Sequence, residues 1–237
     1  MELLTQTTPG ICYLDSINLI WQNIDKGNGI QYFWLGQQPY EPVWELQKEL
    51  HAKRVSGEIP DVVLLLEHDH VYTLGKNGDR NHLLDSKPKN AEVVQIDRGG
   101  EVTYHGPGQL VCYPIIDLHD YQMSVSWYMR SLENVVIQCM KEFGIETKKK
   151  DGLPGVWVDD DKICAMGVRL SKWVTMHGFA LNINPDMSYF DGMIPCGILE
   201  YGITSLYEQE IDIKIQIVVN KIVFYFDDLF IKNENEV

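Results

Sequence analysis

Residues 98–116, with the sequence RGGEVTYHGPGQLVCYPII, join a glycine-rich segment to an apolar run of strand length. Glycine allows positive φ angles and lets the backbone approach a ligand closely. Four glycines fall within eleven residues here, next to side chains that can bind a ligand or move a proton: Arg98, Tyr104 and His105. We therefore expect residues 98–110 to form a binding loop between two strands, 92–97 and 111–116. A plain hairpin is the alternative.

The chain on both sides of this segment carries further strand patterns. Residues 62–66 (VVLLL) are a continuous apolar run, which predicts a buried central strand. An acidic turn at 159–161 precedes residues 162–170, which we expect to be the returning strand of a β-hairpin. Residues 173–183 predict one more strand. A sheet of at least these strands would dominate the fold.

Helix patterns alternate with the strands. Helices are predicted over 39–54 and over 124–143, the second with a serine cap at its start and Gly144 as its stop. Residues 211–230 fit a strand or a helix, and their length favours a helix from about residue 213. Residues 12–24 remain open between a strand and an amphipathic helix. No linker or repeat interrupts the pattern, so residues 1–237 are expected to form a single domain of the α/β class.

Composition excludes several functions. The 237 residues carry 20 basic and 34 acidic side chains, a net charge of −14 that disfavours nonspecific binding to nucleic acids or anionic membranes. Neither a signal peptide nor an apolar run of membrane-spanning length is found, so we expect a cytoplasmic protein. The only dense basic run is Lys148-Lys149-Lys150, which is either a solvated loop or a docking spot for an acidic partner.

The five cysteines are widely spaced and form no Cys-x-x-Cys pair, which argues against zinc and against a disulfide framework. His68 and His70 could suggest a metal site, but no third ligand is evident, so no metal is expected. Cys196 lies between Pro195 and Gly197, where a turn could expose its thiol. In isolation such a cysteine is more often a buried apolar residue. A neighbouring cation would favour the nucleophilic thiolate, and Lys162 is the candidate for this role.

Several separate motifs resemble one known family. They are residues 98–111, Tyr72-Thr73-Leu74-Gly75, Gly155-Val156-Trp157-Val158, residues 162–169, residues 177–182, Pro195-Cys196-Gly197-Ile198 and residues 202–206. In this order they look like the octanoyltransferases that begin lipoate synthesis (the LipB family). The resemblance covers roughly residues 60–206.

The resemblance implies a function and a fold. The implied reaction moves an octanoyl group from octanoyl-acyl carrier protein to Cys196, and from there to a lysine amine of a lipoyl domain. Implied acceptors are the glycine-cleavage H protein and dehydrogenase E2 subunits. The implied fold is a mixed β-sheet flanked by helices, shared with lipoate ligases and the biotin ligase catalytic domain. No cofactor is implied, because the thioester donor is already activated.

The resemblance also assigns residues. Cys196 would be the nucleophile, and Lys162 would lower the pKa of its thiol and act as acid and base. His177 is a supporting candidate. The implied acyl-binding residues are Arg98, Gly99, Gly100, Glu101, Val102, Thr103, Tyr104, His105, Ala165, Met166, Gly167, Gly178, Phe179 and Ala180.

Residue chemistry agrees with these roles but leaves alternatives open. The small and apolar residues at 165–167 and 179–180 suit an acyl slot, and backbone N–H groups near Gly178 or Gly197 could form an oxyanion hole. One alternative is an ATP-dependent lipoate or biotin protein ligase on the same fold, although no nucleotide loop is evident. Others are an amidotransferase that moves octanoate between lipoyl domains, and a lipoyl-domain binder without catalysis. A chain of net charge −14 would also need a local basic patch to bind acidic partners.

Overall fold

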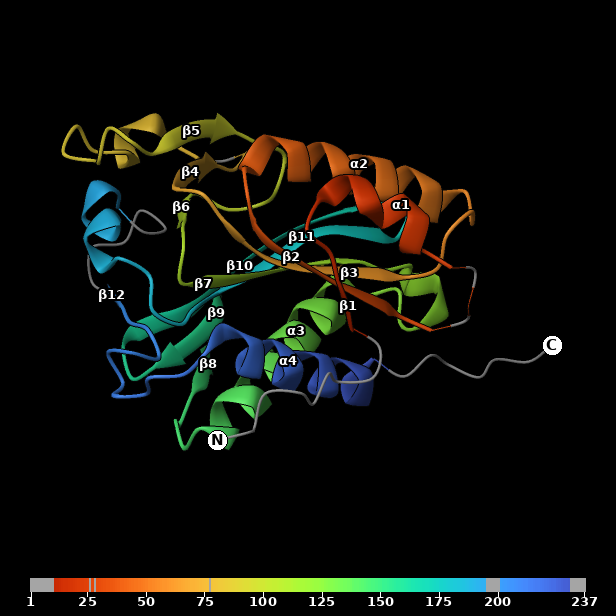
Figure 1. Ribbon diagram of the computed structural model, residues 1–237. Coiled ribbons are helices and arrows are strands. Elements are labelled where there is room, and N and C mark those ends of the chain that lie inside the picture. Colours follow the sequence, from red (N-terminus) through yellow and green to blue (C-terminus); the bar gives the residue numbers. More distant parts are fainter. Residues whose placement is uncertain (1–10, 26, 28, 77, 195–200, 231–237) are drawn as a thin grey trace.

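The computed structural model describes residues 11–25, 27, 29–76, 78–194 and 201–230. Its largest sheet has the strand order β1-β2-β3-β7-β11-β10-β9-β8, with the short β12 paired to β10 (Figure 1). β1, β2 and β3 are parallel neighbours, whereas each later pair along this path is antiparallel. The strands are β1 (Ile11–Tyr13), β2 (Gln31–Gln38), β3 (Val62–His68), β7 (Gln109–Ile115), β8 (Lys148–Lys150), β9 (Leu153–Val158), β10 (Asp161–Ser171), β11 (Val174–Asn182) and β12 (Gly202–Ile203).

Helices cover both faces of this sheet. α2 (Tyr40–Val55) and the short α1 (Ile20–Asn23) lie on one face, and α3 (Val125–Glu142) and α4 (Ile215–Leu229) pack together on the other (Figure 1). The apolar run of β3 is fully buried because both of its sides meet a helix layer. The prediction of a mixed sheet flanked by helices is therefore confirmed. No helix in the described ranges is long and apolar enough to cross a membrane.

A second sheet of three strands, in the order β5-β4-β6, packs against the start of α2. Its strands are β4 (Val71–Leu74), β5 (Glu92–Gln95) and β6 (Val102–His105). Tyr40 and Trp44 of α2 contact Val71, Val94 and Ile96 there. The 3-10 helix η4 (Met187–Gly192) packs on the same small sheet through Tyr189. Segments far apart in the sequence are thereby gathered at one end of the main sheet.

These elements correct one expectation and give the secondary structure of two segments that the sequence left open. The predicted loop 98–110 is interrupted by β6, which pairs antiparallel with β4, so only its ends are turns. Residues 12–24 contain both β1 and, after a turn, the 3-10 helix η1 (Ile17–Leu19) followed by α1. Lys148–Lys150 form the edge strand β8 rather than a loop, and Lys150 Nζ lies 2.7 Å from a carboxylate oxygen of Asp160. The remaining 3-10 helices are η2 (Arg80–His82) and η3 (Leu118–Asp120).

Candidate active site

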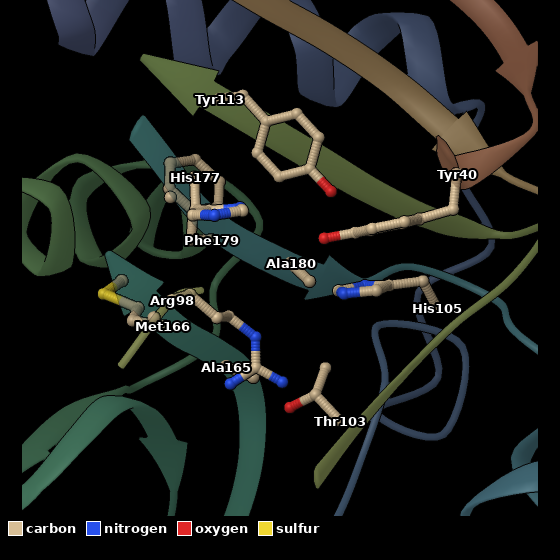
Figure 2. A pocket seen from close by; sticks show the side chains of 12 residues that line it. Tyr40, Arg98, Thr103, His105, Tyr113, Ala165, Met166, His177, Phe179 and Ala180 are labelled. Carbon is tan, nitrogen blue, oxygen red and sulfur yellow. The ribbon is translucent and has the colours of Figure 1, made fainter. Parts of the chain in front are cut away.

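A cavity of about 30 Å³ opens between β10, β11 and the second sheet (Figure 2). Ten residues that the sequence predicted line it, and two that it did not predict, Tyr40 and Tyr113, complete the wall. The ten are Arg98, Thr103, His105, Ala165, Met166, Gly167, His177, Gly178, Phe179 and Ala180. The sequence motifs therefore converge on one pocket, although they come from separate strands.

Two paired glycines on neighbouring strands leave the base of this cavity free of side chains. Gly167 of β10 pairs with Gly178 of β11. A Cβ atom on Gly178 would overlap the carbonyl oxygen of Cys112, and one on Gly167 would lie 3.1 Å from Arg98 Cδ. Side chains at these positions would push the strands apart or fill the cavity.

Arg98 supports the cavity wall by holding the glycine turn in place. Its guanidinium donates to the carbonyl and hydroxyl oxygens of Thr73, at 3.0 Å each, and to the carbonyl oxygen of Gly99. The side chain is buried and points toward Thr103 and Ala165 (Figure 2). Gly99 and Gly100 belong to this turn and do not line the cavity. Glu101 also lies away from it, with its carboxylate 3.2 Å from His82 Nδ1.

A chain of hydrogen bonds fixes the polar side of the cavity. His68 Nδ1 lies 3.0 Å from the carbonyl oxygen of Gln38, which can only accept, so this nitrogen carries the hydrogen. His68 Nε2, 2.9 Å from the Tyr113 hydroxyl, therefore accepts from it. The Tyr40 hydroxyl points toward that of Tyr113 (Figure 2). Burial lowers the pKa of His68 to about 4, which keeps the imidazole neutral at pH 7. His68 thus has a structural role that its sequence context did not reveal.

His177 stands at the far end of the cavity in an unusual backbone conformation. Its φ angle is 56°, in the left-handed region, where β-strand residues other than glycine are rarely found. The side-chain oxygen of Gln47 accepts from its backbone N–H at 3.0 Å, and Asp97 Oδ1 accepts from its Nε2 at 2.9 Å. This bond and the guanidinium of Arg169 lower the pKa of Asp97 to about 2. Sequence reasoning missed Asp97, because an acid at a strand end is unremarkable without its partners.

A second cavity, also of about 30 Å³, contains Lys162. It shares Thr103 and Ala165 with the first cavity, so the two spaces adjoin. Val102 and Tyr104, predicted to bind substrate, line this cavity rather than the first. The other residues around it are Gln109, Asn182, Phe190, Met193 and Ile203. Lys162 Nζ lies 4.6 Å from the centre of the Trp157 ring, across the β9–β10 pair.

His105 connects the two cavities through an amide network. Its Nδ1 lies 2.7 Å from Gln109 Oε1, and Gln109 Nε2 donates to Asn182 Oδ1 at 2.9 Å. Burial lowers the pKa of His105, so the ring is neutral at pH 7. A neutral histidine shapes the wall rather than supplying charge to it.

Cys196, Gly197 and the rest of 195–200 lie outside the described residues, and the predicted nucleophile is therefore not tested by geometry. The described residues that flank this stretch are informative. Met193 before it and Ile203 after it line the same cavity as Lys162. The described chain on both sides of residues 195–200 therefore lies at the Lys162 cavity.

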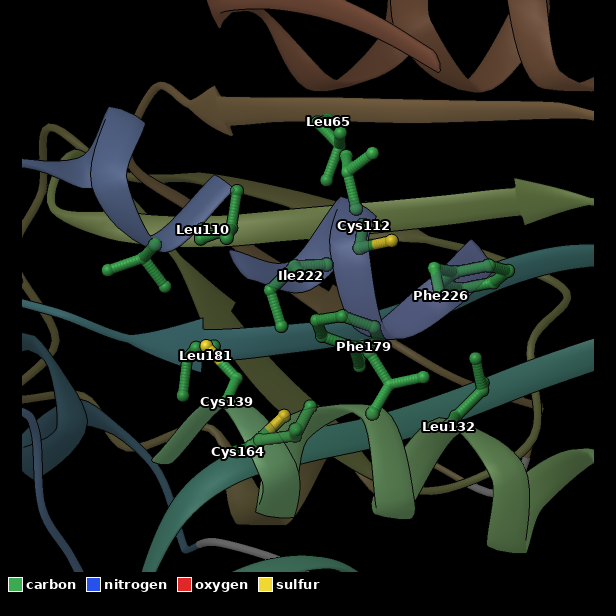
Figure 3. Packing of buried hydrophobic residues seen from close by; sticks show 14 of the residues in the cluster. Leu65, Leu110, Cys112, Leu132, Cys139, Cys164, Phe179, Leu181, Ile222 and Phe226 are labelled. Atoms are coloured by element: carbon green, nitrogen blue, oxygen red, sulfur yellow. The ribbon is translucent and has the colours of Figure 1, made fainter. Parts of the chain in front are cut away.

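Three other cysteines are poor nucleophiles. Cys112, Cys139 and Cys164 are fully buried in the core between the main sheet and helices α3 and α4 (Figure 3). Burial raises the pKa of each thiol, that of Cys139 to about 12. Within the described ranges, no group of three or more His, Cys, Asp or Glu side chains is arranged to hold a metal ion.

Comparison with known proteins identifies the family. Residues 39–227 match the model of the lipoyl protein ligase A/B catalytic domain. The chain is 49% identical to an octanoyltransferase of Gloeobacter violaceus over 164 residues, which cover 69% of this chain and 73% of the relative. It is 44% identical to an octanoyltransferase of Christiangramia forsetii over 218 residues, which cover 83% and 93%.

Solved structures agree on the fold. A putative lipoate protein ligase from T. acidophilum matches with a TM-score of 0.65 at 14% identity, covering 86% of this chain and 85% of that one. A biotin protein ligase from Aquifex aeolicus, in complex with biotin and ATP, matches with a TM-score of 0.53 at 17% identity, covering 83% and 68%. Both the predicted fold and the predicted resemblance are confirmed. The chain belongs to the octanoyltransferase family of lipoyl protein ligase A/B catalytic domains, whose members are acyltransferases.

Proposed function

We propose that this chain transfers an octanoyl group from octanoyl-acyl carrier protein to the lysine amine of a lipoyl domain, through a thioester on Cys196. The observation that carries the proposal is the pair of adjoining cavities. One is a glycine-floored slot, and the other holds Lys162 and both described flanks of the Cys196 segment. An octanoyl group whose carbonyl lies beside Lys162 would then extend its alkyl chain past Ala165 into the slot.

The strand register places His177 about one octanoyl chain length from Ala165. The side chain of Lys162 runs along β9 toward Gly155, which pairs with Ala165, so its amine end lies near the level of Ala165. An extended chain advances about 3.3 Å for every three backbone bonds, so the seven C–C bonds of octanoyl span about 8 Å, or two to three strand residues. Measured along β10 from Ala165, this distance ends between Gly167 and Val168, and His177 pairs with Val168 on β11. His177 and its bond to Asp97 would then stand at the end of the chain.

Lys162 would serve both halves of the reaction. As an ammonium group it favours the Cys196 thiolate, which attacks the carrier's thioester and forms a new C–S bond. The bond between the acyl carbon and the carrier sulfur breaks, and the carrier thiolate takes a proton from Lys162. Lys162 is then a neutral amine. When the acceptor lysine attacks, a C–N bond forms, the Cys196 thiolate leaves, and Lys162 accepts the proton that the acceptor nitrogen loses. The cycle closes with Lys162 charged again.

Intact-protein mass spectrometry tests the proposal. Incubation with octanoyl-acyl carrier protein should add one octanoyl group to the wild type and none to Cys196→Ala. Addition of a lipoyl domain should then discharge the wild-type adduct and acylate the domain. A wild type without an adduct, or an adduct that persists in Cys196→Ala, would refute the thioester mechanism.

A further inference from the structure

His70 occupies the turn between β3 and β4, and two neighbours hold its ring. The imidazole stacks on the ring of Tyr189 from η4, with centroids 4.1 Å apart and planes 3° from parallel. Its Nδ1 lies 2.7 Å from the hydroxyl oxygen of Tyr104 on β6. The rings of Tyr104 and Tyr189 also stack, at 5.0 Å. His70 is thus the third member of a stack that joins β6 to η4.

The residues around this stack leave space for it and hydrogen-bond to it. Gly106 lies beside it, and a Cβ atom there would overlap the Tyr104 hydroxyl and lie 3.0 Å from His70 Nδ1. The backbone of Tyr189 accepts a hydrogen bond from the Tyr72 hydroxyl, and its own hydroxyl accepts from Asn90 Nδ2 at 2.7 Å. His70 therefore adds a second link between β6 and η4, beside the direct stack of Tyr104 on Tyr189.

The stack leads directly to the Lys162 cavity. Tyr104, Phe190 and Met193 are three of the residues that line this cavity. Phe190 follows Tyr189 in η4 and meets the Tyr104 ring edge-on, with centroids 5.1 Å apart. His70 itself does not line either cavity. Any effect of His70 on chemistry must therefore pass through Tyr104 and η4.

We propose that His70 is a positioning residue for acyl transfer, which fixes Tyr104 and η4 so that the wall of the Lys162 cavity keeps the shape that the reacting carbonyl needs. The inference rests on the proposed function. Reactions between held groups are sensitive to small displacements of the wall that orients them. A displaced wall should lower kcat more than it raises KM for the acyl donor, because His70 makes no contact with the donor's slot.

Three replacements separate the two contacts. His70→Ala removes both, and we expect kcat for octanoyl transfer to fall roughly tenfold, since a stacked pair and a hydrogen bond are lost together. His70→Asn keeps a hydrogen-bonding group near the position of Nδ1, and His70→Phe keeps the stacked ring. Each of these two variants should have a higher kcat than His70→Ala. When Tyr104→Phe is added to His70→Asn, kcat should fall back to the His70→Ala value, because the Tyr104 hydroxyl that the asparagine bonds is gone.

The control is His119→Ala, which removes an exposed histidine bonded to Asp117 on η3 and should leave kcat at the wild-type value. Thermal unfolding of every variant, with kinetics measured well below the unfolding range, separates positioning from stability. The proposal is overturned if His70→Ala keeps the wild-type kcat, or if Asn and Phe recover no more activity than Ala. A wild type that transfers no octanoyl group in the same assay would refute the proposed function instead.

Discussion

Ala165 is the position where one substitution should separate the slot from the chemistry. It lines both cavities, so an acyl chain that runs from Lys162 into the slot must pass it. Ala165→Leu places three more carbon atoms at this junction. The residue is partly exposed rather than part of the packed core, so the larger side chain can be accommodated without unfolding the sheet.

The magnitude follows from the apolar surface that the chain would no longer bury. About six methylene or methyl groups of octanoyl lie beyond the junction, and each buried one contributes about 0.8 kcal/mol, or about 4–5 kcal/mol in total. Because part of this energy is offset by ordering of the chain, we expect kcat/KM for octanoyl transfer to fall roughly 100- to 1,000-fold. An acetyl group ends before the junction, so its slower transfer should change little.

The assay compares octanoyl and acetyl donors on the wild type and on Ala165→Leu, with acylation followed by mass spectrometry. Ala52→Leu, the same replacement at an exposed position of α2, is the matched control and should behave as the wild type. The reasoning is refuted if Ala165→Leu keeps the wild-type preference for octanoyl over acetyl. An equal loss for both donors would also contradict it, because a blocked slot affects only the longer chain.

Three further predictions concern other parts of the site. Lys162→Ala should slow formation of the octanoyl-enzyme by roughly 100-fold or more in rapid-quench experiments, and an unchanged rate would remove the lysine from the mechanism. Asp97→Asn should lower the free energy of unfolding at pH 7 by about 1–2 kcal/mol, from the low pKa of Asp97 with allowance for solvent screening, as measured by urea titration of tryptophan fluorescence. The pKa of Asp97 is about 2 in the fold against an ordinary 3.8, so this stabilisation is fully present above pH 3.8 and is lost as the pH falls through about 2. A difference in unfolding free energy between variant and wild type that grows on acidification would contradict the assignment, and the replacement Asp85→Asn at an exposed position should leave the midpoint unchanged. Calorimetric titration with ATP should give no binding heat, whereas saturable binding would favour the ATP-dependent ligase.

Local signals predicted the long elements of the fold well. The helix predicted over 124–143 is α3, where the Ser124 hydroxyl accepts from the Trp127 N–H and Gly144 adopts a φ of 76°. Capping and periodicity are properties of neighbouring residues, so they can be read from the chain. Strand β6 could not be predicted in this way. Its four residues lie between glycines and form a strand only because they pair with β4, which is distant in the sequence.

The site was predicted in part for the same reason. The family resemblance named residues on separate strands, and the structure brings Arg98, Ala165 and Gly178 to one cavity. Tyr40 and Tyr113 were missed because each reads as an ordinary core aromatic until its hydroxyl finds a partner in the fold. The division into two adjoining cavities depends on the second sheet, whose position no local pattern specifies.

The buried thiols of the core have a practical consequence for chemical labelling. Electrophiles such as iodoacetamide react with exposed thiolates, and Cys112, Cys139 and Cys164 offer neither exposure nor a low pKa while the protein is folded. In a Cys12→Ser background, alkylation of the native protein would therefore report on Cys196 alone. The core thus makes this enzyme a suitable scaffold for covalent probes, because its three buried cysteines contribute no background.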